Sequence, residues 1–417
     1  MKTIVYWFRN DLRLEDNPAF LQACNEADYL LPIYIHQAYF EEETLWGFPR
    51  VGEHRRVFLD QSLQDLSTQL RNRESDLLEL SGDPLGIFEK LCSQIKADVI
   101  YCEQVEAPEE LEQVARLRDA GFQVDTIWQS SMLDPQFLPF TLQEMPDVFT
   151  QFRQQVEKHK LRFAKPVPAP QEIPQLPVLE ISHSVAGITD HQTSDYLFHG
   201  GEQGARTHIH QYFERRLPDT YKQTRNQLIG MDYSSKFSPW LALGCSSART
   251  IAKQLSEYEV CFGANDGTYW LWFELLWRDY FRFLHFKFST RLYRSKGLSQ
   301  NPGNQFDAES FLLWSSGNTG EGLVDAGMRQ LQKTDYLSNR MRQIVASYWI
   351  YDMQGDWQAG AAWFESQLID YDVYSNQGNW LYIAGKGTDP RGGRPFNVSK
   401  QTQEHDLEGA YRKIWLV

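Results

Sequence analysis

The sequence predicts a two-part protein. We expect an α/β N-terminal domain over 1–160, a linker over 161–200 and an all-helical C-terminal domain over 201–417. The first third alternates short apolar runs with segments of helical period, a proline-rich stretch follows, and the rest is helical in period. Because buried strands alternating with amphipathic helices are typical of βαβ units, the N-terminal domain should contain a doubly wound parallel sheet.

The patterns place the elements of the N-terminal domain. The strand-like runs are Thr3–Phe8, Tyr29–Ile35, Leu77–Leu80, Asp98–Cys102 and Phe122–Trp128. The segments of helical period are Arg55–Leu70, Pro84–Ile95 and Pro108–Ala120. The first strand is followed by RNDLRLEDN and not by GxGxxG, which argues against an ordinary dinucleotide site and against a P-loop.

The later segments read as a linker followed by helices. KPVPAPQEIPQLPVLE is rich in proline and has no helical period, as expected of an extended connection. The predicted helices are Gly201–Arg216, Ser246–Leu255, Thr268–Phe288, Ala308–Ser315, Gly322–Lys333, Asn339–Asp352 and Gln358–Ile369.

Composition narrows the class of protein. Aromatic residues make up 14% of the chain, which suits a large core or a site for a planar cofactor or stacked bases. The net charge of −14 argues against a nucleic-acid partner unless basic residues cluster locally. The five cysteines form no CxxC pair, charged residues come too early for a signal peptide, and no apolar stretch is long enough to span a membrane. We expect a cytoplasmic monomer without a metal site.

The segment YWLWFELLWRDYFRFLHF is the first candidate for chemistry. At 3.6 residues per turn, Trp270, Glu274, Trp277 and Phe281 share one helix face. Two interpretations stay open. The segment is either a core helix in which Glu274 pairs with Arg278 or another basic group, or a pocket wall where indoles stack on a base and the carboxylate binds its edge.

Hydroxyl groups and a lysine gather before another predicted helix. Ser234, Ser235 and Ser238 surround Lys236, directly before Pro239. This arrangement suits a phosphate at a helix start, while ordinary N-capping by Ser235 or Ser238 is the alternative.

Two later segments carry further polar candidates. In LSNRMRQIVAS, Asn339 opens a predicted helix that includes Arg342. LIDYDVYSNQGNWLYIAGKG carries Asp370, Asp372 and Asn376 before a glycine-rich turn with Trp380 and Tyr382. Two aspartates in a D-x-D pattern are only a weak metal signal. Basic residues cluster between Arg278 and Lys296 and again between Arg391 and Lys400, which makes a nucleic-acid groove possible despite the acidic total.

Together these segments resemble the photolyase/cryptochrome family, and specifically its DASH cryptochrome branch. The resemblance covers almost the whole chain. It rests on WFRNDLRLEDNPAF near the N-terminus and on TRNQLIGMDYSSKFSPWLALG, WFELLWRDYFRF, TGEGLVDAGMRQL, LSNRMRQIVAS and the segment from LIDYDV to GGRPFN, in the family's order and spacing.

The resemblance implies FAD bound in a U-shape inside the helical domain. Tyr221, Ser234, Ser235, Lys236, Phe237 and Ser238 would hold the phosphates and nearby flavin atoms. Glu274, Arg278, Asn339 and Arg342 would contribute along the cofactor. Asp370 and Asp372 would contact the ribityl chain or the ring edge, with Asp370 pairing with Arg342, and Asn376 would face the flavin N5.

The implied activity is photochemical repair of DNA. Light-excited reduced FAD would pass an electron to a cyclobutane pyrimidine dimer that is flipped out or single-stranded. Glu274, Trp277, Asn339 and Tyr382 would act at the lesion. Many photolyases carry Trp at the position of Tyr382 and Met at that of Gln343, so both residues favour the DASH pattern and repair chiefly in single strands. The alternative is a blue-light receptor without significant repair.

The resemblance also implies an electron-transfer chain and an antenna. Trp380 and Trp357 match the proximal and middle members of the chain, while Asn304 stands where the distal Trp is expected. The chain should therefore end early or leave through a tyrosine such as Tyr348 or Tyr351. Glu109 lies near the family's folate-contacting acid, so a methenyltetrahydrofolate antenna is one expectation, and a solvated first-turn glutamate is the other.

Overall fold

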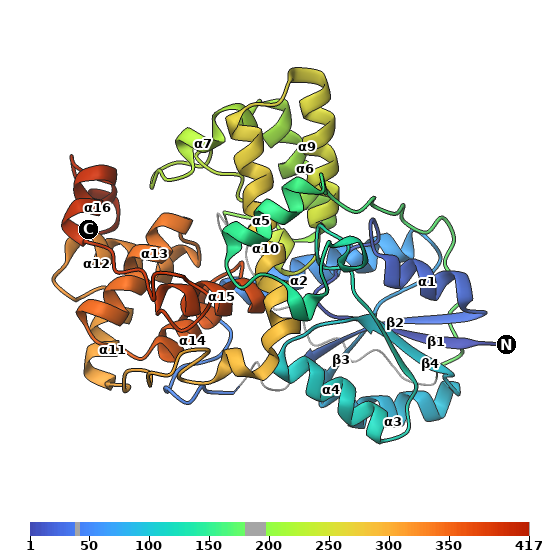
Figure 1. The fold of residues 1–417 in the computed structure, drawn as a ribbon. Helices are drawn as coiled ribbons and strands as arrows, with labels where there is room; N and C mark the ends of the chain where they lie inside the picture. The colour runs from blue at the N-terminus through green and yellow to red at the C-terminus, as the bar shows by residue number, and fades with distance from the viewer. Residues whose placement is uncertain (38–41, 180–196, 417) are drawn as a thin grey trace.

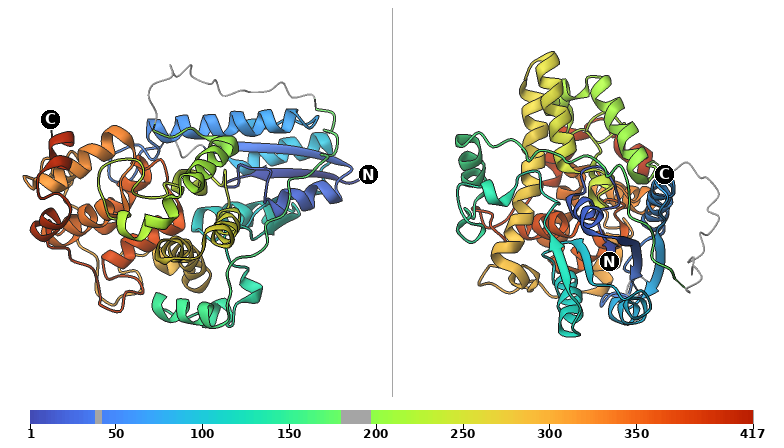
Figure 2. Two further views of the ribbon diagram at one scale, coloured as in Figure 1. Left: turned by 90° about the horizontal axis from the view of Figure 1, so that it is seen from above. Right: turned by 90° about the vertical axis from the view of Figure 1, so that its right-hand side faces the viewer.

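The structure, a computed structural model, describes residues 1–37, 42–179 and 197–416 (Figure 1). A sheet with flanking helices lies at the end of the molecule that carries the N-terminus, and the C-terminal helices lie at the opposite end (Figures 1 and 2). The predicted fold class, an α/β domain followed by a helical domain, is confirmed.

The sheet is parallel throughout and has five strands in the order β3-β2-β1-β4-β5. Its strands are β1 (Thr3–Phe8), β2 (Tyr29–Gln37), β3 (Leu78–Gly82), β4 (Val99–Glu103) and β5 (Val124–Ile127). The order reverses direction between β1 and β4. In a doubly wound sheet the crevice at this point, beyond the strand carboxyl ends, is where ligands bind.

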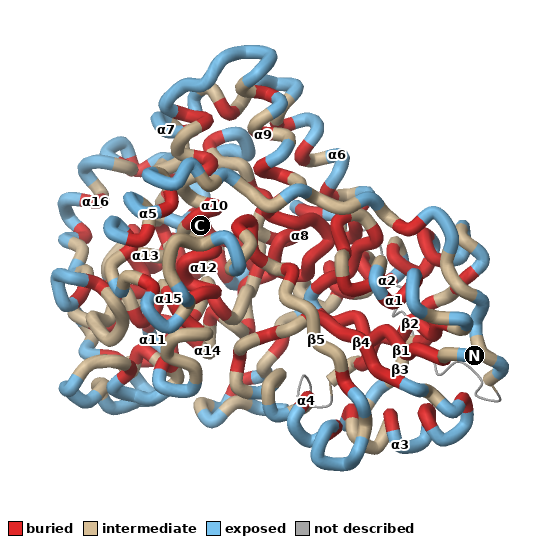
Figure 3. The backbone as a smooth tube through the Cα atoms, turned by 45° about the vertical axis from the view of Figure 1, so that its right-hand side comes forward, coloured by how far each residue is buried: buried red, intermediate tan, exposed pale blue. Residues whose placement is uncertain are grey.

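Both faces of the sheet are covered, which explains why β1 is buried at every position and apolar after Thr3. Ile4, Tyr6 and Phe8 join the core under α1 (Pro18–Glu26) and α2 (Glu53–Arg71). Val5 and Trp7 join a second core under α3 (Pro84–Ile95) and α4 (Pro108–Asp119). The first core continues into the helical part of the molecule, so the two parts share one apolar interior (Figure 3).

The helical part is built around one long helix. This helix, α10, runs through Asp266–Phe288, and its N-terminus is closed by a capping box at Asn265. The other α-helices after the sheet are α5 (Phe149–Lys158), α6 (Gly201–Glu214), α7 (Tyr221–Thr224), α8 (Ser238–Ala242), α9 (Ala248–Phe262), α11 (Ala308–Ser315), α12 (Gly322–Thr334), α13 (Asn339–Ser347), α14 (Trp357–Gln367), α15 (Val373–Ile383), α16 (Val398–His405) and α17 (Ala410–Trp415).

Two expectations about the C-terminal part were wrong in detail. Trp380 and Tyr382 lie on the helix α15 and not in a glycine-rich turn. The helix predicted over Asn339–Asp352 changes at Tyr348 into one π-helical turn. The helix α15 contains three residues of low helix propensity, Asn376, Gly378 and Asn379. Packing of α15 against its neighbours therefore stabilises a helix that the local sequence does not favour.

The loop after β1 connects the two parts of the molecule. The Arg13 guanidinium donates to the Gly244 carbonyl at 2.9 Å, and the buried carboxylate of Asp16 pairs with Arg249 at 2.8 Å. RNDLRLEDN therefore serves as a docking loop for the helical part, where another doubly wound protein would have a phosphate loop.

Of the predicted linker, residues 161–179 and 197–200 are described, and 180–196 lie outside the described residues. The described part contains no helix and runs along β2, where the Gln175 carbonyl accepts from the Leu30 amide at 3.1 Å. Across the described ranges, no helix is both long and apolar enough to cross a membrane.

Gly378→Ala is expected to destabilise the protein by about 1–3 kcal/mol, because a Cβ at this position would overlap the Phe281 ring on α10. Chemical denaturation of the protein without cofactor measures the change. Gly86→Ala, in the open first turn of α3, is the control. Equal stability of the two variants would show that α15 does not need this close approach.

Candidate cofactor and substrate site

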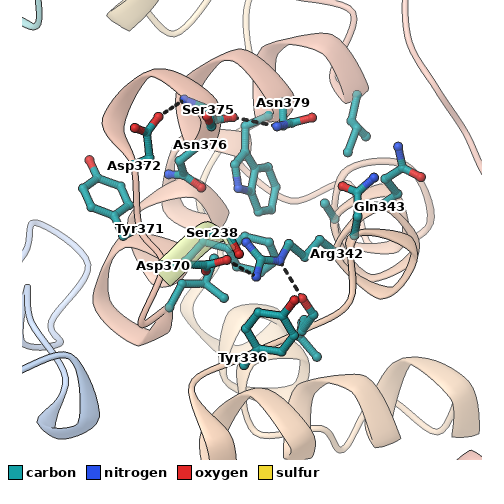
Figure 4. Close-up of a pocket in the computed structure, with 17 residues that line it drawn as sticks. Ser238, Tyr336, Arg342, Gln343, Asp370, Tyr371, Asp372, Ser375, Asn376 and Asn379 are labelled. Atoms are coloured by element: carbon teal, nitrogen blue, oxygen red, sulfur yellow. Dashed lines mark hydrogen bonds and ion pairs between the residues drawn. The ribbon is translucent and has the colours of Figure 1, made fainter. Parts of the chain in front are cut away.

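Two adjoining cavities lie among α8, α10, α13 and α15. Their volumes are about 530 Å³ and about 190 Å³. The volume of the larger cavity is within the range typical of ligand sites. They share the side chains of Tyr336, Asn339, Arg342 and Asp370, so they form one continuous space, here called the central cavity. Figure 4 shows its smaller part, with α15 on one side and Arg342, Asp370 and Tyr336 on the other.

The central cavity collects almost every residue that the sequence singled out. Its larger part is lined by Tyr221, Ser234, Ser235, Lys236, Phe237, Ser238, Glu274, Trp277, Arg278, Asn339, Arg342, Asp370, Asp372 and Tyr382. Asn376 and Trp380 line its smaller part. Segments separated by up to 161 positions in sequence thus meet at one site, as Tyr221 and Tyr382 show.

Asp370 and Arg342 form a buried pair beside the cavity. Asp370 Oδ2 accepts from Arg342 at 2.8 Å, and only 1% of the aspartate side chain is exposed. The other carboxylate oxygen, Oδ1, is buried and has no hydrogen-bond partner among the described residues. Since a buried acceptor without a donor is costly, this oxygen is available to a ligand hydroxyl or N–H group.

Asp372 has two structural roles at the start of α15. It caps the helix by accepting from the Ser375 amide at 2.7 Å, and it pairs with Arg282 on α10. Burial by itself would raise its pKa, but Arg282 and Arg278 lower it to about 2. The two aspartates therefore serve as counter-charges for arginines and not as a pair of metal ligands.

Lys236 is a buried cation with no carboxylate partner in the described part of the chain. Lys236 is 3% exposed, and its ammonium lies 3.6 Å from the ring centroid of Tyr233. Burial is the main cause that lowers the pKa of Lys236 to about 7, and repulsion from Arg342 is the second cause. An anionic group in the cavity would stabilise the charged form.

The serines near Lys236 do not act as helix caps. Phe237 is the N-cap of the one-turn helix α8, and no side-chain hydrogen bond closes its start. The capping alternative for Ser235 and Ser238 is therefore wrong, and both serines line the cavity.

The partner of Glu274 is Arg225, a residue that sequence reasoning missed. The two form an ion pair, and the Arg225 guanidinium lies 4.6 Å from the ring centroid of Trp270. Burial raises the pKa of Glu274, and Arg225 opposes the rise. The expected alternative partner, Arg278, instead donates to the backbone carbonyls of Ser130 and Leu241.

Trp277 and Tyr382 form an aromatic wall of the larger part of the cavity. Trp277 stacks on Phe149 of α5, with ring centroids 3.6 Å apart and 13° between the planes. Tyr382 meets Trp277 edge-on at 5.4 Å and accepts from Arg394 at 2.7 Å. Arg394 and Phe149 were not predicted as site residues, because neither lies near the motif on α10 in sequence.

α15 presents a polar amide and an indole to the smaller part of the cavity. The face is formed by residues at the helical spacing i, i+3, i+4 and i+7, which are Asn376, Asn379, Trp380 and Ile383. The Asn376 amide nitrogen donates to the Ala361 carbonyl at 3.0 Å, which directs its side-chain oxygen away from that carbonyl. Trp380 is 2% exposed.

Glu109 and Trp357 lie at a third cavity of about 310 Å³. This cavity is also lined by Asn10 after β1, so it lies at the switch point of the sheet. The two carboxylate oxygens of Glu109 accept from Arg50 at 2.9 and 2.7 Å, while 47% of the glutamate side chain stays exposed to solvent.

The position expected to hold a distal tryptophan has a structural use. The Asn304 amide donates to the carbonyls of Ile350 at 3.1 Å and Gly355 at 3.2 Å. The hydroxyl of Tyr351, one expected exit, donates to the Ile383 carbonyl at 2.7 Å.

Family comparisons match both parts of the molecule. Residues 4–172 match the family described as DNA photolyase, and residues 270–417 match the FAD binding domain of DNA photolyase. The chain belongs to the photolyase/cryptochrome family. It carries the family's FAD-binding domain, and the predicted family resemblance is confirmed.

Full-length relatives place the chain beside the DASH cryptochromes. It is 41% identical to cryptochrome DASH of Synechocystis sp. over 99% of this chain and 87% of that protein. It is 40% identical to cryptochrome DASH of Xenopus laevis over 100% of this chain and 82% of the relative.

Solved structures give the same result. The crystal structure of a Synechocystis sp. cryptochrome matches with a TM-score of 0.93 at 40% identity, covering 100% of this chain and 89% of that one. A class III photolyase from Agrobacterium tumefaciens matches with a TM-score of 0.83 at 26% identity, covering 100% of this chain and 86% of that one.

The central cavity fits FAD by its own chemistry. Lys236 would place a buried positive charge beside a diphosphate, and the unpartnered Oδ1 of Asp370 would accept from a hydroxyl or a ring N–H.

Proposed function

We propose that this protein is a blue-light-driven, FAD-dependent enzyme that repairs cyclobutane pyrimidine dimers, preferentially in single-stranded DNA. One observation carries the proposal. Glu274, Trp277 and Tyr382 line the same cavity as Lys236, Arg342 and Asp370, so a bound pyrimidine dimer and a bound flavin would share one space.

Bound FAD would supply a light-driven electron donor. Lys236 and Ser238 would hold its diphosphate, Asp370 and Arg342 would orient its ring and ribityl chain, and Asn376 would offer an amide beside the ring. The low pKa of Asp372 keeps this carboxylate charged, so Arg282 stays fixed between α10 and α15.

Glu274 and the aromatic wall would hold the lesion. The carboxylate, paired with Arg225, would accept hydrogen bonds from pyrimidine N–H groups, and Asn339 would add a neutral polar contact. Trp277 and Tyr382 would pack on the dimer and exclude water from it.

Two features of the aromatic wall support a preference for single strands. Phe149 already covers one face of Trp277, and Arg394 holds the Tyr382 hydroxyl. Fewer free aromatic surfaces then remain to offset the few kcal/mol needed to open a duplex.

The central test uses protein loaded with FAD, a reductant, blue light and oligothymidine that contains cyclobutane dimers. Repair restores thymine in light and not in darkness, and faster with single-stranded than with duplex substrate. Glu274→Gln should reduce the rate by about 10–100-fold, since it removes a charged hydrogen-bond acceptor at the lesion. Light-driven flavin reduction with no restored thymine would instead support a signalling receptor.

We also propose that the third cavity holds an antenna such as methenyltetrahydrofolate. Its position at the sheet's switch point and the Arg50–Glu109 pair support this use. Glu109→Gln is expected to weaken retention of added folate about tenfold, because it removes a charged acceptor worth ~1.4 kcal/mol.

Absorption after gel filtration measures the bound folate. Glu112→Gln, on the same helix, is the control. If both variants retain folate as the unsubstituted protein does, Glu109 has no part in antenna binding.

The protein's setting is a proposal as well. All five cysteines are free thiols, which supports the reducing cytoplasm as its compartment. We propose that it acts as a monomer on DNA.

A further inference from the structure

A contiguous row of indoles leads from the central cavity into the helical core. Trp380 lines the smaller part of the cavity, and its ring centroid lies 6.3 Å from that of Trp314, with the planes at 81°. Trp314 stacks on Trp349, with centroids 5.2 Å apart and 27° between the planes. Trp314 and Trp349 are fully buried.

The row differs from the route through Trp357. The Trp357 indole N–H donates to the Ser295 carbonyl at 2.8 Å, and the ring borders the third cavity. Asn304, at the position expected for the distal tryptophan, has no oxidisable ring, and its amide donates to the backbone carbonyls of Ile350 and Gly355. Trp349 packs directly on Gly355, where a Cβ would overlap its ring. The segment that Asn304 fixes is therefore part of the pocket that holds Trp349.

We propose that Trp314 and Trp349 form an electron-transfer branch from Trp380, which ends in a stacked indole pair that stores a positive charge. The inference rests on the proposed function, because the oxidant is the blue-light-excited, oxidised isoalloxazine of FAD. Trp380 gives one electron to this oxidant, and the Trp314–Trp349 pair then gives one electron to oxidised Trp380. No bond breaks and no proton moves. An external thiolate later returns one electron to the pair and becomes a thiyl radical.

Stacking makes the positive charge more stable on the Trp314–Trp349 pair than on Trp380. A cation over the face of an indole is stabilised by about 0.5–2 kcal/mol, and more when water is excluded. Trp314 and Trp349 lie face to face, whereas Trp380 meets Trp314 edge-on and Phe364 at 76°. Since all three indoles are buried, the penalty for burying charge is similar along the row.

The hydrogen bonds of the pair keep its proton in place. The Trp314 N–H donates to the Val345 carbonyl at 3.0 Å, and the Trp349 N–H donates to the Asp356 carbonyl at 2.7 Å. A backbone carbonyl is too weak a base to remove the proton from an indole radical cation. The pair therefore remains a cation until an electron returns, and the oxidised state is long-lived and reversible.

Transient absorption and electron paramagnetic resonance of the FAD-loaded protein test the branch, because charged and deprotonated indole radicals give different signals. We expect a long-lived radical cation in the unsubstituted protein. Trp349→Phe should shorten its lifetime about tenfold, the factor that corresponds to ~1.4 kcal/mol of lost stabilisation. Trp357→Phe should leave most of the signal.

Trp363→Phe is the matched control, since Trp363 packs on Phe311 of the same cluster but is not part of the row. A second measurement needs no flavin. Circular dichroism of the protein without FAD should show exciton coupling between the stacked indoles, which Trp349→Phe removes and Trp363→Phe retains.

Loss of the signal in Trp357→Phe with no change in Trp349→Phe would overturn the branch. A deprotonated radical in the unsubstituted protein would overturn the stored charge. Failure of the proposed function has a different signature, in which no thymine is restored while the radical signals respond to the variants as described.

Discussion

Lys236→Met is expected to change stability and FAD affinity in opposite directions. The Met side chain keeps the length of the buried stem and removes its charge. Without FAD, the variant should be more stable, with a free energy of unfolding about 2–4 kcal/mol higher near pH 7, because burial holds the pKa of Lys236 at about 7. FAD affinity should fall by about 10–100-fold, since a charged hydrogen bond to phosphate is lost.

The pH dependence follows from the direction of this pKa shift. A lysine whose pKa is lowered in the folded protein destabilises the fold only where the unfolded chain would be protonated. The penalty is absent above the ordinary lysine pKa, grows as pH falls and is complete below about pH 7. The stabilisation by Lys236→Met should therefore vanish at high pH.

Denaturant unfolding without FAD and fluorescence titration with FAD measure the two effects. Lys253→Met, which removes an exposed lysine 3.7 Å from Glu257, should change neither. Unchanged FAD affinity in Lys236→Met would contradict a phosphate contact, whatever happens to stability.

Asp372→Asn is expected to cost about 3–5 kcal/mol of stability and to abolish retention of FAD. Asn still caps a helix, so the cap of α15 should survive. The loss comes from Arg282, which is 3% exposed at its side chain and would keep its charge without a partner. Asp356→Asn, which alters the equivalent cap of α14, is the matched control and should change stability little.

Acid should mimic the Asp372 substitution. Because Arg282 and Arg278 lower the pKa of Asp372 to about 2 against the opposing effect of burial, its stabilising contribution is complete above the ordinary aspartate pKa. It is lost as pH falls toward 2. Across this pH range, the free energy of unfolding should fall more steeply with decreasing pH in the unsubstituted protein than in Asp372→Asn. Parallel curves would mean that the ion pair contributes nothing.

Local patterns in the sequence predicted the elements whose burial follows from their own run of apolar residues. The strands from β1 to β5 and the helices α3 and α11 lie where apolar period placed them, because side-chain burial repeats with the geometry of the element. The composition of the central cavity was also predictable, since its residues come from motifs that the family resemblance identifies.

The helix α15 could not be predicted in the same way. Gly378 weakens a helix in isolation, yet it is what lets α15 approach Phe281 closely. Nothing in the segment itself reports that a ring from α10 occupies this space.

The sequence alone therefore determined the fold class, the order of the two domains and the set of residues available to a flavin. Only the tertiary structure decided that Glu274 pairs with Arg225 and that Trp349 stacks on Trp314. The physical reason is range. Periodicity reflects contacts between an element and its neighbouring layer, whereas a buried charge or a stacked ring finds its partner among residues that the chain brings together only after folding.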